Sequence, residues 1–174
     1  MSWTIQAAAS QNGHLAIVTG ANTGLGYDTA LALAGKGCAV VLACRNMDKA
    51  RKARLEILKP FPKATIECLS LDLSSQQSVR AFVTAFTENY DKLDLLINNA
   101  GIMMPPFSLS EDGFESQLAA NYLGHFALTG LLLPLLTRTP NSRIVSLSSL
   151  AHNWGGIRFD DLNFARGYNK RAAY

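Results

Sequence analysis

A glycine-rich segment near the N-terminus is the first part of this sequence whose residue spacing points to chemistry. Residues 19–26 read TGANTGLG, after a short apolar run at 15–18 and at the start of an apolar, helix-like run at 25–35. Glycines at such a junction permit a tight turn and let the backbone approach a pyrophosphate seated on the helix N-terminus. A plain strand-to-helix turn would show the same glycines, but the flanking elements favour the phosphate interpretation. The candidate residues are Gly20, Asn22, Thr23, Gly24, Leu25 and Gly26.

The residue that follows the second apolar run predicts which dinucleotide is bound. Folds that prefer NAD place an acid at this point to bond the ribose 2′-hydroxyl. Here residues 43–46 read Ala-Cys-Arg-Asn, with Arg45 in place of an acid. A guanidinium suits a 2′-phosphate, which it can bind as a charged fork. An exposed arginine near a helix start is the plainer alternative. We expect NADP(H) as the cofactor, with Arg45 on its 2′-phosphate.

Two further polar features stand at positions where chemistry is possible. Phe114, Leu118, Asn121 and His125 share one face at helical spacing. An amide on such a stripe must find partners or cost about 1–3 kcal/mol. Asn121 is therefore either a satisfied structural residue or part of a site, and we expect His125 to be a core histidine.

A serine pair, Ser148 and Ser149, follows the apolar run 143–147. In parallel α/β sheets, ligand sites form outside the carboxyl ends of the strands. The pair is therefore expected at the edge of a site.

These candidates require alternating strands and helices to position them. Short, continuous apolar strands indicate a sheet covered on both faces, and the alternation predicts a doubly wound parallel α/β (Rossmann) fold. We expect a polar segment at 1–13, one domain at 14–174, and a long loop over 150–173. The expected strands are 15–18, 39–43, 65–69, 93–97 and 143–147; the expected helices are 25–35, 48–58, a helix from the capping-box pair Ser74 and Gln77 to about Tyr90, and 110–136.

Composition excludes several classes of function. The net charge of +3 comes without a basic stripe, so no nucleic-acid partner is expected. Cys38, Cys44 and Cys68 are odd in number and lack CxxC spacing, which predicts buried free thiols and no metal site. The segment 1–13 resembles neither a signal peptide nor an anchor, and the apolar stretch 123–136 is too short to span a bilayer. We expect a cytoplasmic protein without a membrane span.

The motifs together resemble the short-chain dehydrogenase/reductase family. Besides TGANTGLG, the sequence carries LDL at 71–73, NNAG at 98–101, Asn121, and IVSLSS at 144–149, in the order and spacing of that family. The resemblance covers almost the whole chain. The segments ACRN, NYLGHF, SSLAH and FDDLN are most similar to its retinol dehydrogenase-like branch.

The resemblance implies a role for each matching residue. Asp72 would accept from the adenine amino group, with Leu73 beside the ring; a strand-end cap is the alternative for Asp72. Ser149, second in the serine pair, would bond the substrate oxygen, and Asn121 would bond main chain, bend its helix and support a proton-relay water. The residues expected to line the cofactor after the fourth strand, where a simple turn is the alternative, are Asn99, Ala100 and Gly101.

The catalytic tyrosine of the family belongs to a Tyr-x-x-x-Lys motif on a helix. Residues four apart share a helix face, and the lysine lowers the tyrosine pKa from about 10 toward working pH. Tyr168 is followed four residues later by Ala172, so it does not match. Tyr174 matches, because it lies 25 residues after Ser149 and follows Ala173, as in the retinol dehydrogenase-like branch. The lysine would fall past the last residue, so we expect an N-terminal fragment that is inactive alone.

The implied activity is reversible hydride transfer between NADPH and a lipophilic aldehyde or ketone, or the matching alcohol. The full-length protein could also be a homo-oligomer. A protochlorophyllide-type reductase is one alternative, although cysteines would be expected near the tetrapyrrole and none lies beside Ser149 or Tyr174. A non-catalytic dinucleotide-binding or scaffold module is the other, and it would need only the glycine loop and Arg45.

Overall fold

The computed structural model describes residues 4–174, so residues 1–3 of the expected polar segment 1–13 lie outside the description. A short 3-10 helix at Ile5–Ala7 occupies the described part of that segment. The elements in chain order are η1 (Ile5–Ala7), β1 (Leu15–Thr19), α1 (Gly24–Gly35), β2 (Ala39–Cys44), α2 (Met47–Leu58), β3 (Ile66–Ser70), α3 (Gln76–Asn89), β4 (Leu95–Asn98), η2 (Leu118–Leu123), α4 (Gly124–Arg138), β5 (Arg143–Ser146), η3 (Leu150–Trp154) and α5 (Lys170–Ala173).

The five strands form one parallel sheet in the order β3-β2-β1-β4-β5. The chain builds outward from β1 in one direction and then crosses back to place β4 on the other side of β1. This reversal puts the topological switch point between β1 and β4. Open α/β sheets bind ligands at the carboxyl ends of the strands beside such a point, and the predicted Rossmann fold is confirmed.

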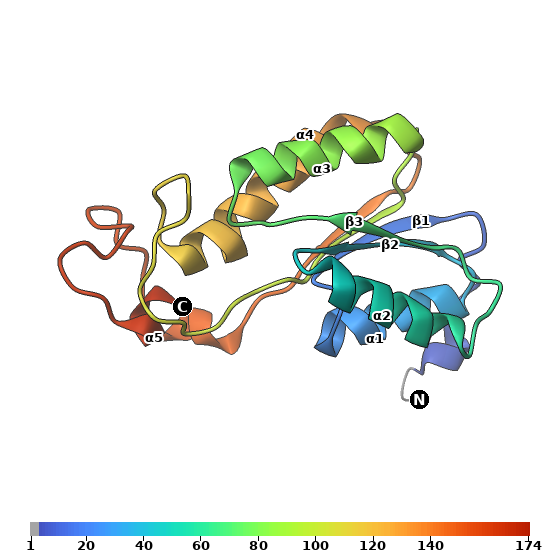
Figure 1. Ribbon diagram of the computed structural model, residues 1–174, viewed down its shortest axis with the longest axis horizontal. Helices are drawn as coiled ribbons and strands as arrows, with labels where there is room; N and C mark the ends of the chain where they lie inside the picture. The colour runs from blue at the N-terminus through green and yellow to red at the C-terminus, as the bar shows by residue number, and fades with distance from the viewer. Residues whose placement is uncertain (1–3) are drawn as a thin grey trace.

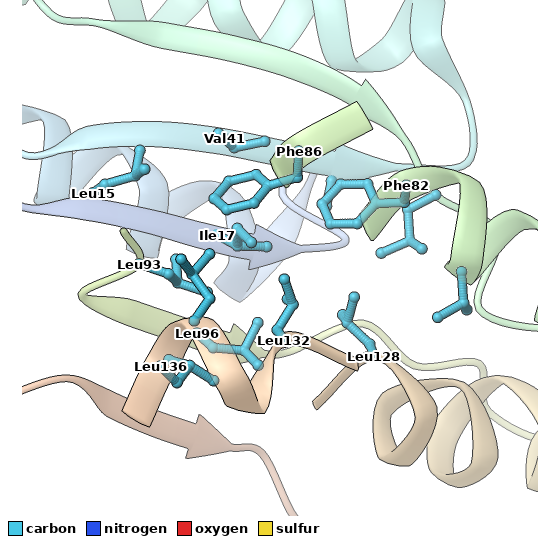
Figure 2. Close-up of a cluster of buried hydrophobic side chains, with 14 of the residues drawn as sticks. Leu15, Ile17, Val41, Phe82, Phe86, Leu93, Leu96, Leu128, Leu132 and Leu136 are labelled. Carbon is cyan, nitrogen blue, oxygen red and sulfur yellow. The ribbon is translucent and has the colours of Figure 1, made fainter. Parts of the chain in front are cut away.

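Helices cover both faces of the sheet, with α3 and α4 on one side and α1 and α2 on the other (Figure 1). Successive strand residues point to opposite faces, so Leu15 and Ile17 enter one core while Ala16 and Val18 enter the other. Figure 2 shows the first core, where Phe82 and other side chains from α3 and α4 gather against the strands. Both cores lie within the sheet-and-helix sandwich, which makes this part of the chain a firm base for the loops at the strand ends.

Two helices begin at other residues than the sequence predicts. The predicted helix at 110–136 begins at Ser116, because residues 109 and 115 pair in an isolated bridge and a turn lies between them. Phe114 therefore precedes the helix. The expected cap at Ser74 is also wrong: the Ser74 hydroxyl donates to Asp72 at 2.6 Å, and Ser75 caps α3 instead.

Two predictions about the C-terminal part and the cysteines also need correction. The expected loop 150–173 contains η3 and α5. Cys38 and Cys44 are buried free thiols as predicted, whereas Cys68 is only half-buried. β5 is an edge strand whose four residues are all exposed.

The helix through η2 and α4 is longer than the predicted apolar stretch. By length and composition alone, its 21 residues from Leu118 to Arg138 could cross a membrane. In the folded chain, Leu128, Leu132 and Leu135 on this helix are buried in the core beside α3. A buried core helix meets the same criteria, so the absence of a membrane span stays a prediction.

Gly124, the first residue of α4, provides a test of the packing between this helix and the loop after β3. An added Cβ would lie 2.1 Å from the carbonyl oxygen of Leu73. We expect Gly124→Ala to lower the free energy of unfolding by about 1–3 kcal/mol, because backbone must move to relieve the clash. Gly130→Ala is the matched control: its Cβ meets nothing within 4 Å, and it should stabilise by about 0.5–1 kcal/mol through helix propensity. Urea unfolding of both variants would measure this, and equal effects would contradict the packing.

Candidate functional site

A cavity of about 450 Å³ opens at the carboxyl ends of the strands, at the switch point between β1 and β4. Most of the predicted cofactor-binding residues line it. Those brought together are Gly20, Asn22, Thr23, Leu25, Gly26, Arg45, Asp72, Leu73, Asn99, Ala100 and Gly101. Gly24 lies outside the lining. A larger hollow of about 700 Å³ at the amino ends of the strands contains none of the predicted site residues.

Two glycines of the loop form a cradle that no larger residue could replace. Gly20 has a φ of +65°, and a Cβ there would lie 2.9 Å from the Cβ of Ala100. A Cβ on Gly26 would lie 2.3 Å from the side-chain nitrogen of Asn99 and 2.7 Å from the Gly20 carbonyl oxygen. Gly24 also has a positive φ, +56°, at the first residue of α1. The backbone is thereby exposed at a helix N-terminus, which suits an anion.

The hydroxyl of Thr19 joins the end of β1 to the turn after β4. Its oxygen accepts the N–H groups of Asn99 and Ala100, each at 2.9 Å. The Asn99 side chain completes the link by donating to the Thr19 carbonyl at 2.8 Å. Thr19 is fully buried, so these bonds fix the position of the NNAG turn against the glycine loop.

Arg45 and Lys49 place two cations at one end of the cavity. Arg45 follows β2, Lys49 lies in the first turn of α2, and both line the cavity. Both side chains are exposed, and within residues 4–174 neither takes part in an ion pair. Asn46 lies between them, and its side chain accepts the Lys49 N–H at 2.9 Å to cap α2. The cap fixes the first turn of α2 and so the direction from which Lys49 reaches the cavity.

Asp72 and Leu73 form the opposite wall beside the loop after β3. The Asp72 carboxylate accepts the N–H and the hydroxyl of Ser74, at 2.9 and 2.6 Å. The capping role considered for Asp72 is thus confirmed, while its other oxygen has no partner among the described residues. Leu73 is buried and offers an apolar surface at the cavity wall.

Asn121 lies in a turn of π-helix and binds the backbone of the loop after β4. Its side-chain oxygen accepts the Ile102 N–H at 2.8 Å, and its side-chain nitrogen donates to the Ile102 carbonyl at 2.9 Å. The predicted main-chain contact is confirmed, and the bend of the helix stays a prediction. The neighbouring Ala120, rather than Asn121, lines the cavity.

His125 is a core histidine, as predicted, and its hydrogen bonds define its tautomer. Nδ1 lies 3.1 Å from the Asn121 carbonyl oxygen, which can only accept, so Nδ1 carries the proton. The lone pairs of the Thr19 hydroxyl oxygen are taken by two backbone N–H groups, so this hydroxyl can only donate to the imidazole. Nε2 therefore accepts the Thr19 hydroxyl proton, at 2.9 Å. Burial lowers the pKa of His125 below 6.5. The imidazole is neutral and joins Asn121 to Thr19.

The predicted catalytic residues Ser149 and Tyr174 lie outside the cavity lining. Ser149 follows β5, and its hydroxyl oxygen accepts the Ala151 N–H at 3.2 Å to cap η3. Tyr174 immediately follows α5 and is half-buried. No hydrogen bond joins the two side chains within the described residues, so their joint role stays a prediction.

The hydroxyl of Tyr168 is engaged in two hydrogen bonds. Its hydroxyl donates to the Pro105 carbonyl and accepts from Gln117, both at 3.0 Å. Loss of hydration and the nearby Glu115 raise its pKa above 10. A proton donor for carbonyl reduction needs a lowered pKa, which argues against a catalytic role for Tyr168.

The comparisons with known proteins decide the family. The short chain dehydrogenase family model matches residues 14–160. Human retinol dehydrogenase 13 is 49% identical over 163 residues, which cover 93% of this chain and 49% of that protein. This chain is a member of the short-chain dehydrogenase/reductase family. It belongs to the retinol dehydrogenase-like branch and spans about half the length of the curated relatives it matches.

Solved structures agree with this short-chain dehydrogenase fold. An uncharacterised protein from Mycobacterium paratuberculosis superposes on all of this chain with a TM-score of 0.88 at 42% identity, over 60% of its own length. A short-chain dehydrogenase from Escherichia coli CFT073, solved with NADPH, matches 94% of this chain and 65% of its own, with a TM-score of 0.73 at 26% identity.

Several residues of this short-chain dehydrogenase site are missing from the sequence-based set. Lys49 could have been found, because it is a basic residue in the first turn of the helix predicted at 48–58, just after Arg45. Thr19 gave a weaker signal, as the one polar residue between an apolar strand and the first glycine. The other cavity-lining residues that the prediction missed are Ala43, Asn46, Leu71, Ile102, Ala120 and Leu147.

The neutral state of His125 predicts how the stability of this short-chain dehydrogenase depends on pH. Because its folded-state pKa is below the unfolded value of 6.5, the unfolded chain binds the proton more readily. The free energy of unfolding should therefore fall as pH drops from about 6.5 through the folded pKa, by roughly 1.4 kcal/mol per unit of pKa difference.

Urea unfolding at several pH values between about 8 and 5 would measure this effect against the reference pKa of histidine. His125→Gln should reduce the loss of stability on acidification. His14→Gln, at an exposed histidine, is the matched control and should keep the parent's pH dependence. If His125→Gln and the parent lose equal stability on acidification, the neutral assignment is wrong.

Proposed function

We propose that the complete protein is an NADP(H)-dependent oxidoreductase. It would transfer hydride between NADPH and a lipophilic aldehyde or ketone, or run the reverse reaction from the matching alcohol. The observation that supports this proposal is the cavity at the switch point, which the glycine loop, Asp72, Arg45 and Lys49 line together. A scaffold module would not require the Ser149 and Tyr174 pair in addition to this cavity.

The residues of this cavity fit a nicotinamide dinucleotide phosphate. Gly20 and Gly26 leave backbone open at the N-terminus of α1, where a pyrophosphate would bind. The free oxygen of Asp72 would accept from the adenine amino group, with Leu73 against the ring. Arg45 and Lys49 would hold the 2′-phosphate, since an acid that would repel it is absent from the end of β2. The E. coli structure solved with NADPH supports this choice.

The catalytic end of the proposed site is built from the segments after β4 and β5. When bound, the cofactor supplies or accepts the hydride. Ser149 would hold the substrate oxygen and Tyr174 would donate or take the proton. Asn121 would keep the loop after β4 in place through Ile102 and would support a proton-relay water.

Exposed apolar side chains in the segment after Ser149 support a lipophilic substrate. Leu150, Ile157 and Phe159 follow Ser149 in the chain and are 71–82% exposed. The name of the human relative gives retinol, a lipophilic alcohol, as its substrate. We further propose a cytoplasmic protein that has no membrane span and no nucleic-acid partner, and that assembles as a homo-oligomer in its full length.

Arg45 provides a test of cofactor choice. Arg45→Asp should weaken NADPH binding about 10–100-fold, because it removes a charge-assisted bond of about 1.5–3 kcal/mol and adds repulsion. NADH binding should change little, so the preference should reverse. Titration of both cofactors by fluorescence would measure it. Lys52→Asp carries the same change of charge on α2 outside the cavity lining and should preserve the preference. Equal affinities for the two cofactors in the unmutated protein would contradict the proposal.

Tyr174 and Tyr168 can be separated by matched substitutions in the complete gene product. Tyr174→Phe should lower kcat about 10²–10⁴-fold, since the proton donor is lost, with NADPH affinity unchanged. Tyr168→Phe should leave kcat within a few-fold of the parent, because its hydroxyl only bonds Pro105 and Gln117. Steady-state assays with lipophilic aldehydes would decide, and the reverse pattern would show that the proton donor is Tyr168.

A further inference from the structure

A buried glutamine at the start of the long helix contacts three residues in two separate segments of the chain. Gln117 is 1% exposed. Its side-chain oxygen accepts the Met104 N–H at 2.8 Å, and its side-chain nitrogen donates to the Tyr168 hydroxyl at 3.0 Å and to the Lys170 carbonyl at 3.3 Å. The loop after β4, the segment before α5 and the first residue of α5 therefore meet at one amide.

The position of Gln117 is itself fixed by a buried carboxylate. Glu115 is also 1% exposed, and one of its oxygens accepts the N–H groups of Gln117 and Leu118, each at 2.9 Å. The Glu115 N–H in turn donates to the Asn163 side chain, which donates back to the Gly113 carbonyl. The residues just before the helix are thus bonded to the segment before α5.

The contact with Lys170 reaches the backbone of Tyr174 through one shared carbonyl. The Lys170 carbonyl accepts the Tyr174 N–H at 3.3 Å as well as the Gln117 amide. α5 contains only Lys170–Ala173, and a helix this short is not stable without tertiary contacts. Gln117 therefore supplies a tertiary hydrogen bond to Lys170, the first residue of the helix that precedes Tyr174.

The side-chain oxygen of Gln117 binds a residue whose backbone conformation is unfavourable. Met104 has a φ of +53°, which costs a non-glycine residue about 1–2 kcal/mol. Asn121, one helical turn after Gln117, binds the same loop at Ile102. Two amides on successive turns thus hold the loop that follows the cofactor-lining NNAG turn.

We propose that Gln117 is a positioning residue that sets Tyr174 relative to the loop after β4, and this proposal rests on the role proposed above for Tyr174. Through one side chain, the amide joins the loop on the cofactor side to the short helix that immediately precedes the tyrosine. Its removal should disturb the catalytic end of the site and leave the adenosine end intact, because Gly20, Arg45 and Asp72 share no bond with it.

The positioning role of Gln117 can be measured without an enzyme assay. In this chain, amide hydrogen exchange followed by NMR should be at least tenfold faster at Tyr174 and Met104 in Gln117→Met than in the parent. Exchange in β1 and β2 should be unchanged. Gln77→Met, at an exposed glutamine of α3, is the matched control and should leave both sites unchanged. Unchanged exchange at Tyr174 in Gln117→Met would overturn the proposal.

The consequence for catalysis is read in the complete gene product. Gln117→Met should lower kcat at least tenfold, while the KM for the aldehyde and the dissociation constant for NADPH stay within twofold. Gln117→Glu keeps an acceptor for Met104 but, when ionised, has no donor for Lys170, so it should lower kcat likewise. It serves as the second variant if the first does not fold. A parent without turnover would refute the proposed function, whereas an active parent and an equally active folded variant would refute the role of Gln117.

Discussion

The hydroxyl of Thr19 is the contact on which the rest of the site depends. It ties the end of β1 to the turn after β4 through two backbone N–H groups, and to the long helix through His125. Parallel strands leave their carboxyl ends without a common covalent link, so such cross-strand bonds set the shape of the edge. The Thr19 hydroxyl is buried, and its proton and both lone pairs are engaged in hydrogen bonds. A shift of the glycine loop or of the NNAG turn would break these hydrogen bonds at a place where water cannot replace them.

The two ends of the site rest on different kinds of structure. The adenosine end is carried by β1, β2 and β4, whose side chains are buried in two cores. The catalytic end is carried by the segments after β5, where most side chains are exposed and α5 is a single short turn. Its position depends on polar contacts at Glu115 and Gln117 and on a small aromatic cluster of Phe107, Phe164 and Tyr168, outside the two main cores. In physical terms, cofactor binding is the more robust property, and proton transfer is the more easily disturbed one.

The sequence predicted the elements and the cofactor end well, because both depend on local patterns. Apolar runs located the strands, and glycine spacing with Arg45 located the cavity. The errors arose where distant residues decide the outcome. Ser74 lost its capping role because Asp72 takes its hydroxyl. The long helix starts late because Glu115 turns inward to cap it, and Gln117 gave no signal because its partners lie 51 and 53 residues away. Lys49 could have been predicted, because it lies in the first turn of the helix that follows Arg45.

The central claim is that the cavity between β1 and β4 holds an NADP(H) molecule with its 2′-phosphate at Arg45 and Lys49. NMR titration of the isotope-labelled chain with NADPH and with NADH measures this most directly. NADPH should shift the amide signals of Gly20, Asn99 and the start of α2, and NADH should shift the first two while leaving the start of α2 unchanged. Shifts gathered instead at the hollow around Asn12, Gly37 and Phe61, at the amino ends of the strands, would contradict the account.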